Sequence, residues 1–291
     1  MRGVVVAPVT PMNKDLSVDL VGLRELTRYL VKSGVTGFTA CAVTAETETL
    51  SVDEHRAVLR AVVEAADHQV PVYCGIGRGS LLETRGLVGF VESIGGDGLF
   101  VITPYASAYS LDEVSAYFRD VAGRTTLPVM LYNCPGYSGV NIPPSTVAEL
   151  ASIENILSIK EGEQSQLQAD LASVEKTGFD VFTARDSYLL ESLSAGAAGV
   201  ISFAANVAPT LLVALDNAWS EGRAREAQDL HERVVALVRI LVTRSYPLFI
   251  KAAMNEIGLP AGPCRRIELS LTDEERVTMS GAIEAVQPTV V

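Results

Sequence analysis

The chain lacks the features that mark membrane, nucleic-acid-binding and nucleotide-binding proteins. No apolar run reaches the roughly 18 residues of a membrane span, and the apolar stretch at the start is too short for a signal peptide. Against 35 acidic side chains stand only 23 basic ones, which gives a net charge of −12. A polyanion would be repelled, so neither nucleic acid nor an anionic membrane is expected as a partner. No Walker A motif and no G-x-G-x-x-G after a strand is present.

Cysteine and histidine are also scarce. The four cysteines are Cys41, Cys74, Cys134 and Cys264. They lie far apart without CxxC spacing, which is typical of reduced thiols in a cytoplasmic protein. The three histidines fall in predicted helices or at helix ends and not at strand ends, so no zinc site is expected.

What the sequence does contain is a regular alternation of short apolar runs with amphipathic stretches. The runs cover residues 4–9, 37–43, 71–77, 98–104, 128–135, 156–162, 180–186 and 198–205. They are continuously apolar and rich in β-branched residues, as expected of parallel strands that are covered on both faces.

The stretches between the runs carry helix signals. Ser51 with Glu54, and Ser110 with Glu113, have the spacing of capping boxes. Eight strand–helix units in about 220 residues predict a (β/α)8 TIM barrel. The pattern changes after Glu221, and three helices are expected at about 223–245, 247–257 and 272–285. We therefore predict a barrel over residues 1–222 and a C-terminal helical appendage over 223–291.

The active site of such a barrel lies at the carboxyl ends of its strands. Lys160 is the only one of five lysines that lies inside a predicted strand. Burial would lower its pKa, and a neutral amine can attack a ketone. The alternative is a buried ion pair with Glu161 or Asp186.

Two further residues are candidates. Tyr132 ends the strand before that of Lys160, so its phenol could exchange protons with intermediates on the amine; alternatively it is a core tyrosine bonded to backbone. Thr44 lies in a sharp turn whose hydroxyl and amides could hold a carboxylate, or it caps its own backbone.

These residues stand in motifs that resemble the dihydrodipicolinate synthase and N-acetylneuraminate lyase family of class I aldolases. The motifs are VTP at 9–11, the segment ending in Glu46, ITPY at 102–105, LYNCPGYSG at 131–139, SIKEG at 158–162, GVISFAANVAP at 199–209, and Pro247 with Lys251. They extend over nearly the whole chain.

The resemblance implies a mechanism and an assembly. Lys160 would form a Schiff base with pyruvate or another 2-oxo acid, and Tyr132 would transfer protons. Thr44 would bind the carboxylate, and Val43, Ile201 and Tyr137 would line the substrate. The family acts as a homotetramer, a dimer of dimers, without metal or organic cofactor. The apolar helices of residues 223–257 also favour an oligomer.

Three positions depart from the family pattern. Val43 replaces a Ser or Thr, so one hydroxyl is missing. Ala106 stands where the synthases carry a tyrosine that reaches a neighbouring subunit's site, and Tyr109 is a candidate substitute. Tyr137 stands where the synthases carry the arginine that binds the carboxylate of aspartate semialdehyde.

We therefore expect a cytoplasmic Schiff-base lyase or aldolase that acts on pyruvate or a 2-oxo acid of the 2-keto-3-deoxy sugar acid type. The open alternatives are 4-hydroxy-tetrahydrodipicolinate (dihydrodipicolinate) synthase, a 2-keto-3-deoxy sugar acid dehydratase, and a non-catalytic sensor that binds a 2-oxo acid. The loss of the arginine disfavours the synthase.

Overall fold

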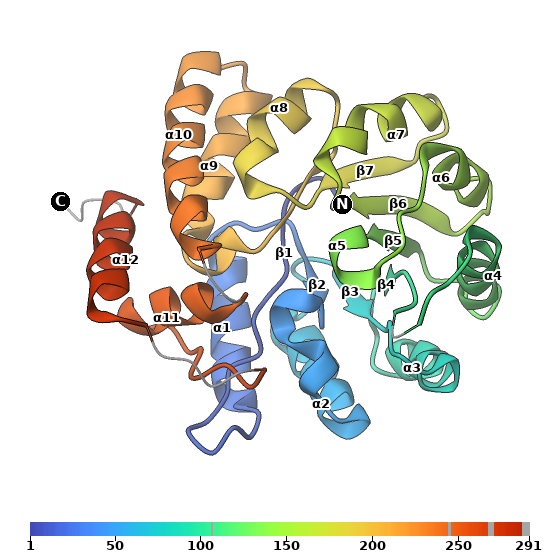
Figure 1. Cartoon of the computed structure of the whole chain (residues 1–291), viewed down its shortest axis with the longest axis horizontal. Coiled ribbons are helices and arrows are strands. Elements are labelled where there is room, and N and C mark those ends of the chain that lie inside the picture. The colour runs from blue at the N-terminus through green and yellow to red at the C-terminus, as the bar shows by residue number, and fades with distance from the viewer. Residues whose placement is uncertain (106, 244–245, 267–270, 287–291) are drawn as a thin grey trace.

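A closed barrel of eight parallel strands forms the centre of the molecule (Figure 1). The computed structural model describes residues 1–105, 107–243, 246–266 and 271–286. The strands are β1 (Gly3–Val6), β2 (Gly37–Ala40), β3 (Val72–Gly75), β4 (Gly98–Ile102), β5 (Val129–Asn133), β6 (Ile156–Glu161), β7 (Asp180–Thr183) and β8 (Gly199–Ser202). Each predicted apolar run overlaps one strand, so the TIM barrel prediction is confirmed.

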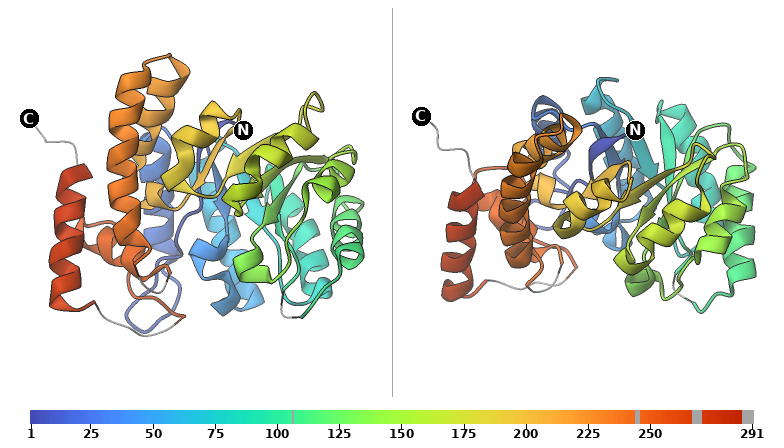
Figure 2. Two further views of the ribbon diagram at one scale, coloured as in Figure 1. Left: turned by 45° about the horizontal axis from the view of Figure 1, so that its top comes forward. Right: turned by 90° about the horizontal axis from the view of Figure 1, so that it is seen from above.

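Helices surround the barrel and continue beyond it. The first nine are α1 (Leu20–Lys32), α2 (Val52–Ala66), α3 (Leu81–Ser93), α4 (Leu111–Ala122), α5 (Pro135–Ser138), α6 (Pro144–Leu150), α7 (Leu167–Ser173), α8 (Leu189–Ser194) and α9 (Pro209–Ser220). They are followed by α10 (Ala224–Leu241), α11 (Leu248–Glu256) and α12 (Asp273–Val286). These three lie together on one side of the molecule, as all views show (Figures 1 and 2). The three C-terminal helices are thus confirmed, and their separateness as a domain stays a prediction.

Local signals in the sequence act as expected. Both capping boxes form, at Ser51 with Glu54 and at Ser110 with Glu113, and they start α2 and α4. In each box the serine side chain accepts from the glutamate amide, and the glutamate side chain accepts from the serine amide. The helices therefore begin at fixed points after β2 and β4, which also fixes the loops at the carboxyl ends of these strands.

Strand residues alternate between two apolar layers. Val5, Met130 and Tyr132 belong to a cluster inside the barrel, whereas Val4 and Leu131 pack outward against the helices. This is the two-residue period of a strand. In β6 the same period turns the Lys160 side chain inward, toward the ring of Tyr132.

The barrel closes where two glycines meet. Gly3 of β1 pairs with Gly199 of β8. Gly199 has φ +149°, and a Cβ atom on it would lie 2.0 Å from the carbonyl oxygen of Gly3. Only glycine allows the two backbones to come this close, so this pair of residues lets the first and last strands join.

The described part of the chain has neither a membrane-spanning helix nor a cluster of metal ligands. There, no helix has both the length and the apolar character to cross a bilayer. Nor do three or more His, Cys, Asp or Glu side chains gather as a metal site would require. The four cysteines are free thiols, of which only Cys134 is partly exposed.

Candidate active site

Lys160 lies inside the barrel, near the carboxyl end of β6 and against aromatic rings. It is 5% exposed, and it is paired in register with Tyr132 of the neighbouring strand. Its Nζ lies 4.4 Å from the ring centroid of Tyr132 and 5.7 Å from that of Phe100. The two rings stack on each other, with centroids 5.0 Å apart. The amine is therefore held over a rigid aromatic surface.

No carboxylate within the described residues lies close enough to pair with Lys160. The Glu161 carboxylate instead accepts from the Asn133 amide at 2.9 and 3.0 Å. The Asp186 carboxylate accepts from the hydroxyl of Ser202 and from the amide of Phe203. The buried ion pair that the sequence left open does not form.

Burial sets the protonation of the amine. It lowers the pKa of Lys160 to about 8; the nearby Arg185 charge acts in the same direction, and Cys134 and Asp186 oppose it. At neutral pH, roughly a tenth of such an amine is uncharged. That fraction is far larger than for a solvated lysine, and only the uncharged form is nucleophilic.

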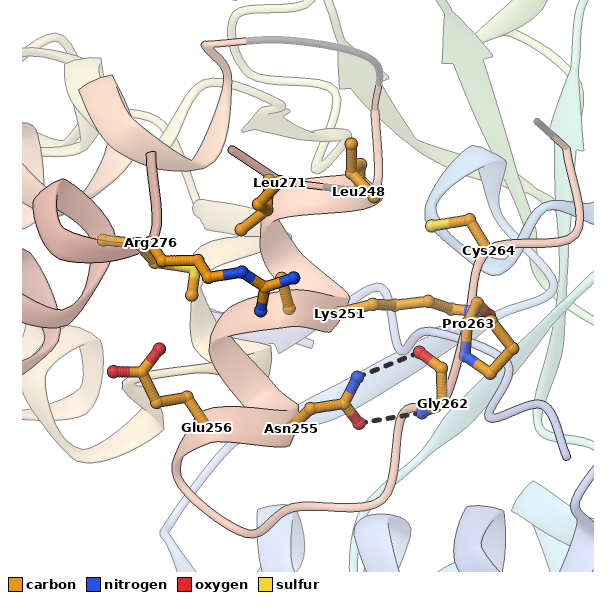
Figure 3. Close-up of a pocket in the computed structure, with 11 residues that line it drawn as sticks. Leu248, Lys251, Asn255, Glu256, Gly262, Pro263, Cys264, Leu271 and Arg276 are labelled. Atoms are coloured by element: carbon orange, nitrogen blue, oxygen red, sulfur yellow. Dashed lines mark hydrogen bonds between the residues drawn. The ribbon is translucent and has the colours of Figure 1, made fainter. Parts of the chain in front are cut away.

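A second buried lysine, Lys251 on α11, provides a contrast (Figure 3). Its Nζ lies 2.6 Å from Glu46 and donates to the carbonyl oxygen of Pro263 at 2.9 Å. It lines a cavity of about 450 Å³ between α11, α12 and the segment 262–264. The Lys251 amine is thus engaged by Glu46 and by a backbone carbonyl, in contrast to that of Lys160.

The Tyr132 phenol is buried but not tied to backbone. No backbone hydrogen bond to its hydroxyl occurs among the residues that the structure describes. Burial raises the pKa of Tyr132 well above its usual range, and the neighbouring Cys134 adds to this. The hydroxyl is therefore protonated at neutral pH and able to donate, and it belongs to a ring whose face lies against the amine.

The turn that carries Thr44 is a 3-10 helix, Val43–Ala45. The Thr44 hydroxyl does not cap its own backbone, because it is hydrogen-bonded at 2.6 Å to the hydroxyl of Tyr246. The ring of Tyr246 packs edge-on against Phe203, with centroids 5.6 Å apart. Sequence reasoning missed Tyr246; its only signal was a tyrosine directly before Pro247.

Glu46 directly follows the turn and holds it in place. This residue has φ 53°, and its carboxylate is fully buried. One carboxylate oxygen pairs with Lys251, and the other accepts from the backbone amides of Arg265 and Arg266 at 2.8 and 2.9 Å. Residues more than 200 positions apart therefore shape the turn that presents Thr44.

The remaining predicted residues lie around the same opening. Ile201 of β8 is fully buried in the inner cluster that includes Tyr132. Val43, Tyr132 and Tyr137 line one narrow cavity. The Tyr137 hydroxyl lies 3.4 Å from a Glu48 carboxylate oxygen, to which it donates. The structure thus brings the predicted residues to one end of the barrel.

The two positions considered for a proton relay are Ala106 and Tyr109. Ala106 lies outside the described residues. Tyr109 packs against the outer hydrophobic cluster, and the hydroxyl that meets Thr44 belongs to Tyr246. A second residue that sequence reasoning did not single out is Arg185, which follows β7 and whose Nε donates to the carbonyl oxygen of Gly162 at 3.0 Å.

Comparisons with known proteins agree on one family. The model of the "Dihydrodipicolinate synthetase family" matches residues 1–286. The chain is 36% identical to 4-hydroxy-tetrahydrodipicolinate synthase of Methanothrix thermoacetophila over 280 residues, which cover 96% of this chain and 94% of that one. The corresponding enzyme of Methanococcoides burtonii is also 36% identical, over 91% of both chains.

Solved structures give the same result. A dihydrodipicolinate synthase from Bacillus anthracis superimposes with a TM-score of 0.93 at 30% identity, covering 99% of each chain. A prophage protein of E. coli K12, solved in complex with pyruvate, gives 0.94 at 28% identity over 98% of each chain. This chain belongs to the dihydrodipicolinate synthetase family of Schiff-base aldolases, and it is an enzyme of the class I aldolase type.

Proposed function

We propose that the protein cleaves or forms a carbon–carbon bond next to a Schiff base between Lys160 and pyruvate or a pyruvate-derived 2-oxo acid of the 2-keto-3-deoxy sugar acid type. The observation that carries the proposal is the state of Lys160. It is buried, free of any carboxylate partner among the described residues, and has a pKa lowered to about 8.

The steps follow from the residues around the amine. Lys160 Nζ attacks the C2 carbonyl, and Tyr132 passes the protons that turn the carbinolamine into an imine with loss of water. Tyr132, having given up its proton in forming the imine, takes the proton of the C4 hydroxyl; the imine takes up the electron pair of the breaking bond between C3 and C4, which releases an aldehyde and leaves an enamine. Protonation at C3 and hydrolysis of the imine by water then release pyruvate and restore the amine.

The turn of Val43 and Thr44 holds the carboxylate of the 2-oxo acid in this proposal. The backbone N–H groups of these two residues have no backbone partner in the described part of the chain. They are the first donors of a short helix, where such groups are left free. The Thr44 hydroxyl, oriented by Tyr246, adds a third donor.

A second candidate is 4-hydroxy-tetrahydrodipicolinate synthase, which is favoured by the names of the curated relatives. Tyr137, bonded to Glu48, stands where the synthases' arginine is expected. Pyruvate release from a panel of 2-keto-3-deoxy acids, compared with condensation of pyruvate and aspartate semialdehyde, separates the two. We further propose a cytoplasmic homotetramer that acts on small molecules.

Borohydride trapping tests the Schiff base. We expect reduction in the presence of pyruvate to place a stable adduct on the peptide that contains Lys160, and Lys160→Ala to abolish it. Tyr132→Phe should still bind pyruvate, but trapping and turnover should slow by roughly 10²–10⁴-fold. The peptide with Lys251 is an internal control, because its amine is paired. An adduct on any other lysine, or on none with any 2-oxo acid, contradicts the proposal.

A further inference from the structure

Arg185 differs from the other arginines near the open end of the barrel. Arg78, after β3, pairs with Glu83 at 3.1 Å. Arg265 and Arg266 hold carboxylates of the loops after β2, with Arg265 at 2.8 Å from Glu54 and Arg266 paired with Glu48. Arg185 has no carboxylate within ion-pair distance among the described residues. It is the guanidinium of this group that remains available.

The side chain of Arg185 is nevertheless held in place. Its Nε donates to the carbonyl oxygen of Gly162 at 3.0 Å, and its backbone amide donates to Thr183 Oγ1 at 3.0 Å. Gly162 directly follows the strand of Lys160, so the guanidinium is anchored over the end of that strand. Within the described chain, its two terminal nitrogens have no hydrogen-bond partner.

The charge of Arg185 reaches the site. Burial has the largest effect on both neighbours, lowering the pKa of Lys160 and raising that of Tyr132. The charge of Arg185 makes a smaller contribution, which lowers the pKa of both. The acids around it are otherwise engaged: Glu163 accepts from the Ser165 hydroxyl at 2.8 Å, and Asp186 accepts from Ser202. Hydrogen bonds from Ser165 lower the pKa of Glu163, and the charge of Arg185 adds to this. No carboxylate of the described chain lies within ion-pair distance of the guanidinium, so an anion placed here would meet a fixed cation.

The surroundings of Tyr137, after β5, have the reverse character among the described residues. There Tyr137 donates to the Glu48 carboxylate, which also takes the charge of Arg266. A substrate carboxylate on that side would face an acid and no free cation. A guanidinium with two free donors binds a carboxylate in a bidentate manner.

We propose that Arg185 binds a carboxylate at the far end of the substrate, so that the enzyme acts on a 2-oxo acid with a second carboxylate. The inference rests on the proposed Schiff-base function and adds its substrate class. In the cleavage direction the products are pyruvate and an aldehyde acid. In the reverse direction C3 of the Lys160 enamine attacks the aldehyde carbon, the new alkoxide takes a proton, and water hydrolyses the imine.

Matched aldehydes test this assignment. Glyoxylate, 4-oxobutanoate and 5-oxopentanoate are each compared with their methyl ester as acceptors at saturating pyruvate. We expect at least one acid to exceed its ester in kcat/KM by about 10- to 100-fold. Arg185→Gln should bring that ratio to about 1; because the effect of the Arg185 charge on the pKa of Lys160 acts on the acid and the ester alike, the ratio and not the absolute rate is the readout. Arg185→Lys keeps the positive charge but lacks the two parallel N–H donors of the guanidinium. Its ratio of acid to ester should therefore lie between those of the wild type and Arg185→Gln.

Controls separate this inference from the underlying function. Arg28→Gln removes another exposed guanidinium, on the outer helix α1, and should keep the wild-type ratio. Each variant is also trapped with pyruvate and borohydride. If the adduct forms on Lys160 but no acid is preferred over its ester, the role of Arg185 is wrong and the Schiff base stands. The same conclusion follows if the preference for an acid persists in Arg185→Gln. A preference for glyceraldehyde 3-phosphate over glyceraldehyde, with none for the acids, overturns the carboxylate assignment. Absence of the adduct overturns the Schiff base itself.

Discussion

Two lysines of this chain show how environment decides the chemistry of one side-chain type. Both are almost fully buried, with Lys160 at 5% and Lys251 at 1% exposed. Lys251 has the Glu46 carboxylate at 2.6 Å, whereas Lys160 has aromatic faces. Burial without a carboxylate partner disfavours the charged form of Lys160, and this outweighs the attraction of the aromatic faces for a cation. The contacts of Lys251 are those of a structural residue, and the surroundings of Lys160 fit the reactive role that we propose for it.

The lowered pKa of Lys160 predicts a pH profile. The neutral fraction of the amine rises with pH until the pKa of about 8 is passed and then levels off. The rate of borohydride trapping with pyruvate should therefore increase about 20-fold between roughly pH 6.5 and 8.5, and little beyond that. A rate that still rises tenfold per unit above about pH 9 would show an amine with the pKa of an ordinary lysine.

At this scale, the sequence predicts residues whose role follows from their place in a strand. Lys160 and Tyr132 end neighbouring apolar runs, and parallel pairing brings them together. Tyr246 could not be found this way, since its partner Thr44 lies 202 positions away in an unrelated segment. Arg185 lies near the end of the predicted run 180–186, but only the structure shows the contact that anchors its guanidinium.

At the scale of elements, the barrel was predictable because continuous apolar runs are a local property. A strand covered on both faces forms a nearly continuous apolar run, and capping boxes mark where helices begin. The loops are different. The turn at Val43–Ala45 takes its shape from Glu46 and its distant partners, Lys251 and the amides of Arg265 and Arg266. Such contacts leave no period in the sequence.

The ion pair of Glu46 and Lys251 predicts a large effect on stability. Lys251→Met leaves a fully buried carboxylate without its cation, which costs about 3–5 kcal/mol. We expect a matching drop in the free energy of unfolding in urea, together with weaker pyruvate trapping because the Thr44 turn loosens. The double variant Glu46→Gln with Lys251→Met removes both charges and should recover part of the loss. Exposed ion pairs contribute about 0–1 kcal/mol. If the free energy of unfolding of Lys251→Met lies within about 1 kcal/mol of the wild-type value, the pair contributes no more than an exposed one.

At the scale of the whole molecule, one argument for an oligomer changes. The apolar residues of α10 and α11 that favoured an interface are largely buried within the chain itself, as Val234, Leu237 and Phe249 show. The expectation of a tetramer therefore rests on family membership.

Light scattering tests the assembly. We expect a mass near four times the 31.0 kDa of one chain, with dissociation to dimers before monomers on dilution. A monomer at all concentrations, with full activity, would contradict the tetramer and would show that one chain completes the site.

The fastening of the Thr44 turn has a consequence for how the protein is made. Synthesis runs from the N-terminus, so all eight strands are complete before Tyr246, Lys251 and Arg265 are added. Until those three residues have been made, the turn that carries Thr44 lacks its anchors. We therefore expect the substrate turn to reach its final shape only after the chain up to Arg265 has left the ribosome, even where the barrel strands have paired before.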